Sequence, residues 1–254
     1  MRWFLGVLLV AGCGRSHFDD AGQDTGIVGG NGDEDQDGVA DGADNCPAIF
    51  NQSQLDTDGD AVGDSCDPHP NSAGDHLANA SFFAGNFGSW APDQTANWKS
   101  GPSELTTVQD ADTTNATLSF AFSAQSPTLQ VGFTILEDNN DTVYTNAITA
   151  TVTSPSLSWS CFLSNTITTA PFSFLQQLHN GGADGNTLVP LPQPLRVGSS
   201  TALQASLDVD RFRCDVAGAS SPFTPVPNTN ATSFSIQIEG VKVALAYALI
   251  YDVP

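Results

Sequence analysis

The sequence predicts an all-β fold: an antiparallel β-sandwich of jelly-roll type, preceded by an irregular acidic segment. From residue 77 onward, apolar and polar side chains alternate with a period of two in several runs, which is typical of strands buried on one face. No long stretch places its apolar residues at the roughly 3.6-residue spacing of a helix. Two packed antiparallel sheets are the natural way for such strands to bury their apolar faces.

The N-terminal residues predict export and a lipid anchor. Residues 1–12 hold one Arg and a short apolar run, as in a signal peptide, and this run is too short to span a bilayer as a mature helix. The run Val10-Ala11-Gly12-Cys13 resembles a bacterial lipobox, which implies cleavage before Cys13 and acylation of that residue. A plain secretory signal is the alternative. Residues 13–32 are rich in Gly and Asp without a period, and we expect a flexible tether there.

Residues 33–67 are too acidic and too poor in apolar side chains to fold by burial alone. They contain ten Asp, one Glu and no Lys or Arg. Burial of so few apolar residues cannot offset the entropy of ordering the chain. The segment is therefore either disordered or ordered by a bound partner.

The spacing of the carboxylates indicates calcium as that partner. Each half of the segment fits positions 1, 3, 5, 7, 9 and 12 of a calcium loop, with a backbone carbonyl at position 7. The first set is Asp33, Asp35, Asp37, Val39 (carbonyl), Asp41 and Asp44, and the second is Asp56, Asp58, Asp60, Val62 (carbonyl), Asp64 and Asp67. Position 12 is Asp where Glu is usual, and no amphipathic helices flank the loops. Ala61 also stands where Gly is expected at position 6, so the second loop lacks the residue that favours its sharp turn.

The same residues resemble a known family. The run DQDGVADGADNCPAIFNQSQLDTDGDAVGDSCD, from Asp35 to Asp67, is similar to thrombospondin type 3 repeats. The matching elements are DxDxDG, which begins at Asp33, then DNCP, NxxQ, DxDxD and GDxCD. The resemblance implies calcium sites wrapped by a chain with little regular secondary structure. It also implies a disulfide between Cys46 and Cys66. The alternative interpretation is an acidic, solvated linker.

Charge excludes one class of function. The net charge is −21, and residues 19–75 hold 15 of the 28 acidic residues and no Lys or Arg. Nucleic acid phosphates would be repelled by such a chain, whereas cations would be attracted. Scarce Lys and abundant Gly, Ser, Thr and Asn are typical of a secreted, β-rich protein.

The sandwich is expected over residues 79–254, after a linker at 68–78 that is stiffened by Pro68 and Pro70. Strands are expected at 118–122, 129–135, 142–153, 157–164, 201–207, 209–216, 234–238 and 241–252. Because segment 241–252 is apolar on both faces, we expect it at a central position in its sheet. Residues 172–178 are a candidate for a helical turn. Cys161 and Cys214 each lie on an inward face of a predicted strand, which favours a buried disulfide over two separate thiols.

A second resemblance concerns the architecture of the sandwich. The entry FFAGNFGSWAPDQTANWKSGPSELTT and the closing ALAYALIYDVP are similar to concanavalin A-like lectin/glucanase domains. A glucanase on this fold needs closely spaced carboxylates, but Glu104, Glu137 and Glu239 lie in unrelated places. We therefore expect no enzyme activity. Four aromatic residues are candidates for stacking on sugars, although packing in the core is the commoner role: Trp90, Trp98, Tyr144 and Tyr251.

Together these features predict a non-enzymatic, calcium-binding surface lipoprotein. Ca²⁺ is the expected cofactor, and a membrane, reached through lipidated Cys13, is an expected partner. The acidic segment would form a calcium-ordered stalk that displays the sandwich for adhesion or for recognition of a surface glycan or protein. A carbohydrate-binding, lectin-like module is the alternative, and a glycan hydrolase is a weaker one.

Overall fold

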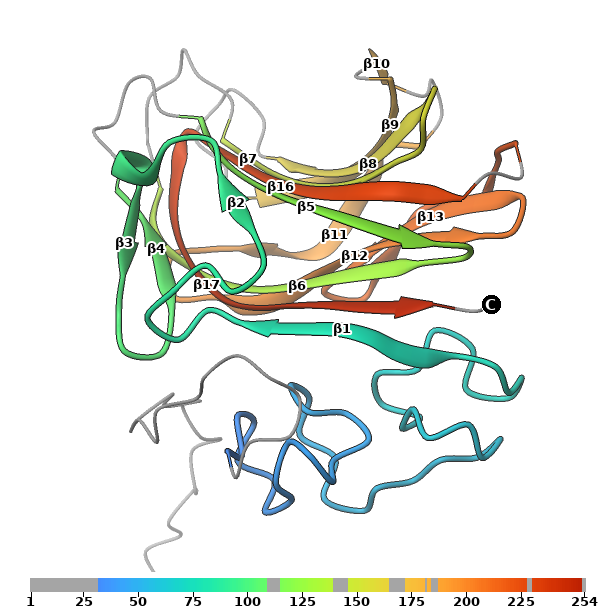
Figure 1. The fold of residues 1–254 in the computed structure, drawn as a ribbon. Coiled ribbons are helices and arrows are strands. Elements are labelled where there is room, and N and C mark those ends of the chain that lie inside the picture. The colour runs from blue at the N-terminus through green and yellow to red at the C-terminus, as the bar shows by residue number, and fades with distance from the viewer. Residues whose placement is uncertain are drawn as a thin grey trace, which may run out of the picture.

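The computed structural model describes residues 32–108, 115–138, 146–164, 172–180, 182–183, 187–227 and 230–252. Within these ranges the chain forms two antiparallel sheets packed face to face, with the acidic segment lying outside them (Figure 1). The predicted signal peptide, Cys13 and the tether at 13–32 lie outside the described residues, except for Gly32. No helix in the described ranges is long and apolar enough to cross a membrane.

The first sheet has the strand order β14-β13-β12-β6-β17-β4-β3, with β1 also paired to β17 and β15 to β13. Its strands are β1 (His76–Phe82), β3 (Trp98–Ser100), β4 (Leu105–Thr107), β6 (Thr128–Asp138), β12 (Ser200–Asp208), β13 (Arg211–Val216), β14 (Ala219–Ser220), β15 (Thr224–Pro225) and β17 (Val241–Asp252). Strand β17 is the centre of this sheet, because β6 pairs along one side of it while β1 and β4 share the other.

The second sheet has the order β10-β9-β8-β7-β16-β5-β2, with β11 paired to β9. Its strands are β2 (Ala91–Pro92), β5 (Ala116–Ala124), β7 (Ala147–Thr153), β8 (Ser158–Ser164), β9 (Phe172–His179), β10 (Gly182–Ala183), β11 (Val189–Leu195) and β16 (Ala231–Glu239). A short 3-10 helix, η1 (Thr95–Asn97), precedes β3.

The main core lies between the two sheets. Alternate residues of β6, from Leu129 to Ile135, share this core with alternate residues of β7, β8 and β16, as the period-two pattern predicted. The predicted disulfide between Cys161 and Cys214 is present and joins β8 in one sheet to β13 in the other. Both cysteines are fully buried, so this bond links the two layers through the core.

Strand β17 is apolar on both faces because each face contacts a different partner. Val243, Leu245 and Ile250 belong to the core between the sheets. Tyr247 and Leu249 belong to a second cluster, on the outer face of the first sheet. The sequence prediction of a central strand is confirmed.

The second cluster places the acidic segment directly on the sandwich. It combines three residues of that segment with side chains of β1 and β17: Cys46, Val62, Cys66, Ala80, Phe82, Tyr247, Leu249 and Tyr251. Figure 1 shows the segment running beneath β1, without regular strands of its own. The expectation of a stalk that displays the sandwich is therefore corrected for this part of the chain, because Cys46, Val62 and Cys66 pack directly on the sheet.

Three further expectations need correction. Residues 172–178 form strand β9 and no helical turn. The expected linker at 68–78 ends early, because β1 already begins at His76. Strand β11 was not expected, since its sequence VPLPQPL contains three prolines. Proline is tolerated there because, among the described strands, β11 pairs with β9 alone and lies at a sheet edge.

Candidate metal centre

The first predicted loop brings three carboxylates together. Oxygens of Asp33, Asp35 and Asp37 lie within 4.8 Å of one another. The turn is held by the backbone N–H of Asp37, which donates to Asp33 Oδ1 and to Asp35 Oδ1, each at 3.1 Å. Gly38 has φ +94°, the left-handed conformation that glycine adopts without strain. The turn therefore brings the carboxylates of three alternate Asp residues of one short segment close together.

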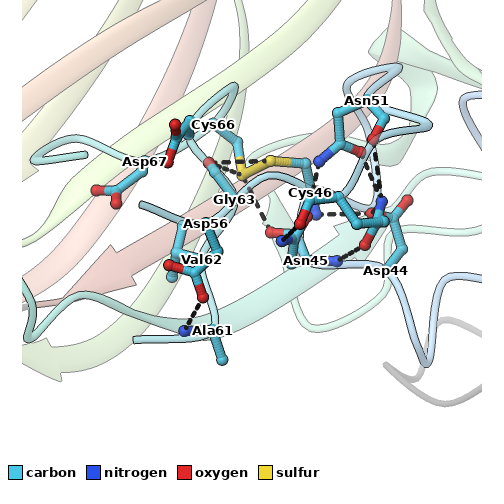
Figure 2. The surroundings of a disulfide bond; sticks show 12 residues. Asp44, Asn45, Cys46, Asn51, Asp56, Ala61, Val62, Gly63, Cys66 and Asp67 are labelled. Atoms are coloured by element: carbon cyan, nitrogen blue, oxygen red, sulfur yellow. Dashed lines mark hydrogen bonds between the residues drawn. A yellow bond between two sulfur atoms is a disulfide. The ribbon is translucent and has the colours of Figure 1, made fainter. Parts of the chain in front are cut away.

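The second loop repeats this arrangement with Asp56, Asp58 and Asp60, whose oxygens are also within 4.8 Å of one another. Ala61 occupies the glycine position with φ 78°, so the turn is made despite the missing glycine. Its backbone N–H donates to Asp56 Oδ2 at 3.0 Å, as Figure 2 shows. The chain bends sharply here at the cost of local backbone strain.

The remaining predicted ligands lie outside these two groups of three. Asp41 Oδ1 accepts from the Glu34 N–H at 2.9 Å, and Asp64 accepts from the Thr57 N–H at 2.7 Å. Asp44 Oδ1 accepts from the Cys46 N–H at 2.8 Å. Each of these contacts closes a turn of the segment. Val39 and Val62, whose backbone carbonyls are predicted ligands, each come shortly after one of the two groups in the sequence. Their role as ligands stays a prediction.

The last predicted ligand, Asp67, groups with Asp60 and with Asp75, a residue that the repeat pattern does not include. Asp75 is only 2% exposed and immediately precedes β1. Its Oδ2 lies 2.9 Å from His69 Nδ1. This third group therefore spans the end of the acidic segment and the start of the sandwich.

Several carboxylate oxygens of the predicted ligands and of Asp75 are buried and have no hydrogen-bond donor. Among the described residues they are Asp35 Oδ2, Asp44 Oδ2, both Asp58 oxygens, Asp67 Oδ2 and Asp75 Oδ1. A buried anionic oxygen without a donor costs considerable free energy, and no Lys or Arg occurs between residues 19 and 75 to compensate it. Bound cations would supply the missing charge, and hard oxygen donors favour Ca²⁺.

The pKa values of two of these carboxyl groups also indicate that a positive charge is needed nearby. Burial, helped by the neighbouring carboxylates of Asp37 and Asp44, raises the pKa of Asp35 to about 7. Burial, together with the adjacent carboxylate of Asp75, raises the pKa of Asp67 to about 7. Both side chains resist ionisation unless positive charge is close by.

Amide side chains hold the two loops in register, and this explains the Asn and Gln of the motif. Gln54 Oε1 accepts from the Asn45 N–H at 2.9 Å, while Asn45 Nδ2 donates to the Gln54 carbonyl at 3.2 Å. Gln54 Nε2 also donates to Asp44 Oδ1 at 2.8 Å and so orients that carboxylate. A Cβ at Gly63 would overlap the Asn45 side chain, which explains the glycine at this position.

The disulfide implied by the resemblance is present at the centre of this arrangement. Cys46 and Cys66 are bonded, with their Cα atoms 5.6 Å apart, and Figure 2 shows the bond between the two loops. Both residues are buried against β1 and β17. The bond therefore fixes the loops to each other at the point where they meet the sheet.

The sandwich has no comparable site among the described residues outside the acidic segment. Trp90, Trp98 and Tyr251 are 2%, 6% and 1% exposed, so these three candidates have the commoner packing role and cannot stack on a sugar from the surface. Tyr144 lies outside the described residues. The three isolated Glu residues are not brought together as a group with other carboxylates.

Comparison with known proteins supports both parts of this description. Residues 27–54 match the family model of the thrombospondin type 3 repeat, so the resemblance is confirmed over the first loop and the residues that follow it. No curated protein matches the chain by sequence.

Solved structures match the sandwich at low sequence identity. The exoplasmic/lumenal domain of VIP36 in its Ca²⁺/Man3GlcNAc-bound form has a TM-score of 0.51 at 10% identity, covering 69% of this chain and 89% of that one. The CBM2 module of the evolved Dit of Lactobacillus casei BL23 phage J-1 has a TM-score of 0.52 at 8% identity, covering 70% and 96%. The GlcNAcα1-4Gal-releasing endo-β-galactosidase from Clostridium perfringens has a TM-score of 0.53 at 7% identity, covering 72% and 64%. These likenesses establish a lectin-like sandwich fold, as the second resemblance implied.

Proposed function

We propose that this chain is an exported calcium-binding protein in which Ca²⁺ folds the acidic segment onto the outer face of a non-catalytic, lectin-like sandwich. The observation that carries the proposal is the set of buried carboxylate oxygens without donors, such as both oxygens of Asp58. Such groups are tolerated when a cation satisfies them. The match to a calcium-binding type of repeat supports the same ion.

Calcium acts structurally in this proposal. Ions at Asp33–Asp37 and Asp56–Asp60 neutralise carboxylates that otherwise repel one another, and this lets the disulfide-linked loops pack on β1 and β17. Extracellular calcium modules of this kind bind at roughly 10⁻⁴ to 10⁻³ M. The folded segment and the sandwich then form one recognition unit at the cell surface.

The test is calorimetric titration of the calcium-free protein with CaCl₂. We expect saturable binding that weakens strongly in an Asp35→Asn/Asp58→Asn variant, which removes from each loop one carboxylate that has a buried, donorless oxygen. Asp210→Asn/Glu239→Gln is the matched control, because it removes the same charge from exposed positions outside the segment. Absence of binding at millimolar Ca²⁺, or equal loss in both variants, would refute the proposal.

The lipid anchor at Cys13 is part of the proposal and has its own test. Labelled palmitate should be incorporated in a bacterial host and lost in Cys13→Ser. Incorporation that persists in the variant would place the acyl group elsewhere, and no incorporation in the original chain would leave a plain secretory signal.

A second candidate function is glycan binding, favoured by a hollow at the joint between the acidic segment and the sheet. The hollow has a volume of about 300 Å³ and is lined by Ile49, Thr134, Ser200 and Tyr247, among others. Thr134 and Ser200 present hydroxyls, and an apolar wall beside a few polar groups suits a sugar ring. A glycan array with Ser200→Trp, which fills the hollow from an exposed position, tests this idea. Release of reducing sugar from any polysaccharide would instead indicate a hydrolase.

A further inference from the structure

The carboxylates of Asp60, Asp67 and Asp75 meet where the acidic segment joins the sandwich. Oxygens from the three residues lie within 4.8 Å of one another. Asp60 belongs to the second loop and Asp67 closes it, whereas Asp75 lies beyond the repeat and directly before β1. Residues 68–74 fold back, and this brings Asp75 close to Asp60 and Asp67.

That fold-back is fixed by contacts that leave carboxylate oxygens unused. The Gly74 N–H donates to Asp60 Oδ2 at 2.9 Å and the His69 N–H donates to Asp67 Oδ1 at 2.6 Å. His69 Nδ1 lies 2.9 Å from Asp75 Oδ2 and so orients that carboxylate from outside the group. Each of the three carboxylates is therefore fixed in position by one contact, although all three carry the same charge.

The decisive feature is the burial of the oxygens that remain. Asp75 is 2% exposed, and its second oxygen, Oδ1, accepts no hydrogen bond. Asp67 Oδ2 is likewise buried without a donor. Adjacent buried carboxylates of this kind require a compensating positive charge.

We propose that Asp60, Asp67 and Asp75 bind a further Ca²⁺ ion, distinct from the ions of the two loops, that ties the acidic segment to strand β1. The all-oxygen donor set suits a hard cation, and the His69 contact to Asp75 is the kind of outer contact that orients a metal ligand. Asp60 would be shared between this ion and the ion of the second loop. Because β1 pairs along β17, the junction ion couples calcium binding to the sheet.

This inference rests on the proposed function, in that the protein must bind calcium at all, but it can fail separately. The number of bound ions is measured by equilibrium dialysis at saturating Ca²⁺ followed by elemental analysis. The chain, Asp75→Asn, Asp67→Asn and the exposed control Asp210→Asn are compared, with near-ultraviolet circular dichroism to verify that each is folded.

Asp75→Asn keeps the shape of the side chain and should lose one ion relative to the original chain, as should Asp67→Asn, while Asp210→Asn loses none. Calcium should also slow amide hydrogen exchange of residues 76–82 in the original chain and fail to do so in Asp75→Asn. Unchanged ion number and unchanged protection in Asp75→Asn would overturn the junction site, as would loss of more than one ion in both variants. An original chain that binds no calcium would overturn the proposed function itself.

Discussion

Tyr247 lies over Gly132 on the outer face of the first sheet, and the two residues are direct cross-strand partners in β17 and β6. A Cβ at position 132 would overlap the tyrosine ring. The ring is buried in the cluster that joins the acidic segment to the sheet, and this burial raises the pKa of Tyr247 to about 12. The absence of a side chain at residue 132 therefore leaves room for the Tyr247 ring, which packs in the cluster that the acidic segment contacts.

Gly132→Ala is expected to displace Tyr247 and weaken this docking. Overpacking of a well-filled site typically costs about 1–3 kcal/mol. Denaturant unfolding in saturating Ca²⁺ measures the loss. In a Tyr247→Ala background the same substitution should cost much less, because the overlap is gone. An equal cost in both backgrounds would mean that the Tyr247 ring is not what position 132 accommodates.

Removal of calcium should loosen the acidic segment and leave the sandwich folded. The core between the sheets has its own disulfide and its own apolar cluster, whereas the segment depends on charge compensation. Hydrogen exchange with and without chelator should therefore show faster exchange in residues 33–66 and little change in β7, β8 and β16. Uniform acceleration across the chain would show that the two parts unfold as one unit.

The two disulfides should have separable effects. Cys46→Ser/Cys66→Ser frees the loops from each other and should weaken calcium binding, while Cys161→Ser/Cys214→Ser should lower the melting temperature of the sandwich with calcium binding retained. Loss of a native disulfide in a small domain typically costs about 2–5 kcal/mol. Calorimetric titration beside thermal unfolding of both variants provides the comparison. Equal losses of calcium affinity would contradict the assignment of one bond to each part.

Much of the fold could be predicted because apolar and polar residues alternate along a strand that buries one face. The burial of β16 follows this rule, and β6 and β8 follow it in the apolar residues of their core faces, although Gln130 and Ser160 on the opposite faces are buried as well. Strand β9 breaks it with Gln177, which is fully buried and donates to the Pro222 carbonyl at 2.7 Å. A buried polar residue satisfied by a distant loop has no local signature, so β9 was mistaken for a possible helical turn.

The carboxylate groups of the candidate metal centre were predictable only where their members are close in sequence. The alternate Asp residues at 33–37 and 56–60 are grouped as their spacing indicated. Asp75 was missed because its partners are brought to it by the fold of residues 68–74, which no repeat pattern encodes. Docking of the segment was missed for a related reason: the two apolar faces of β17 predict a covered strand without revealing that the acidic segment covers one of them.

A final prediction compares position 6 of the two loops, where Gly38 and Ala61 both have positive φ. Ala61→Gly should relieve backbone strain and tighten calcium binding, whereas Gly38→Ala should introduce strain and weaken it. The effects should be about 1 kcal/mol in opposite directions, roughly fivefold in affinity. An added Cβ at Gly38 meets no atom closer than 3.9 Å, so the comparison isolates backbone conformation from steric overlap. Calorimetric titration of the two variants measures both shifts. Two shifts in the same direction would show that positive φ is not what limits these turns, and the calcium loops would then have to be set by the Asn45–Gln54 contacts.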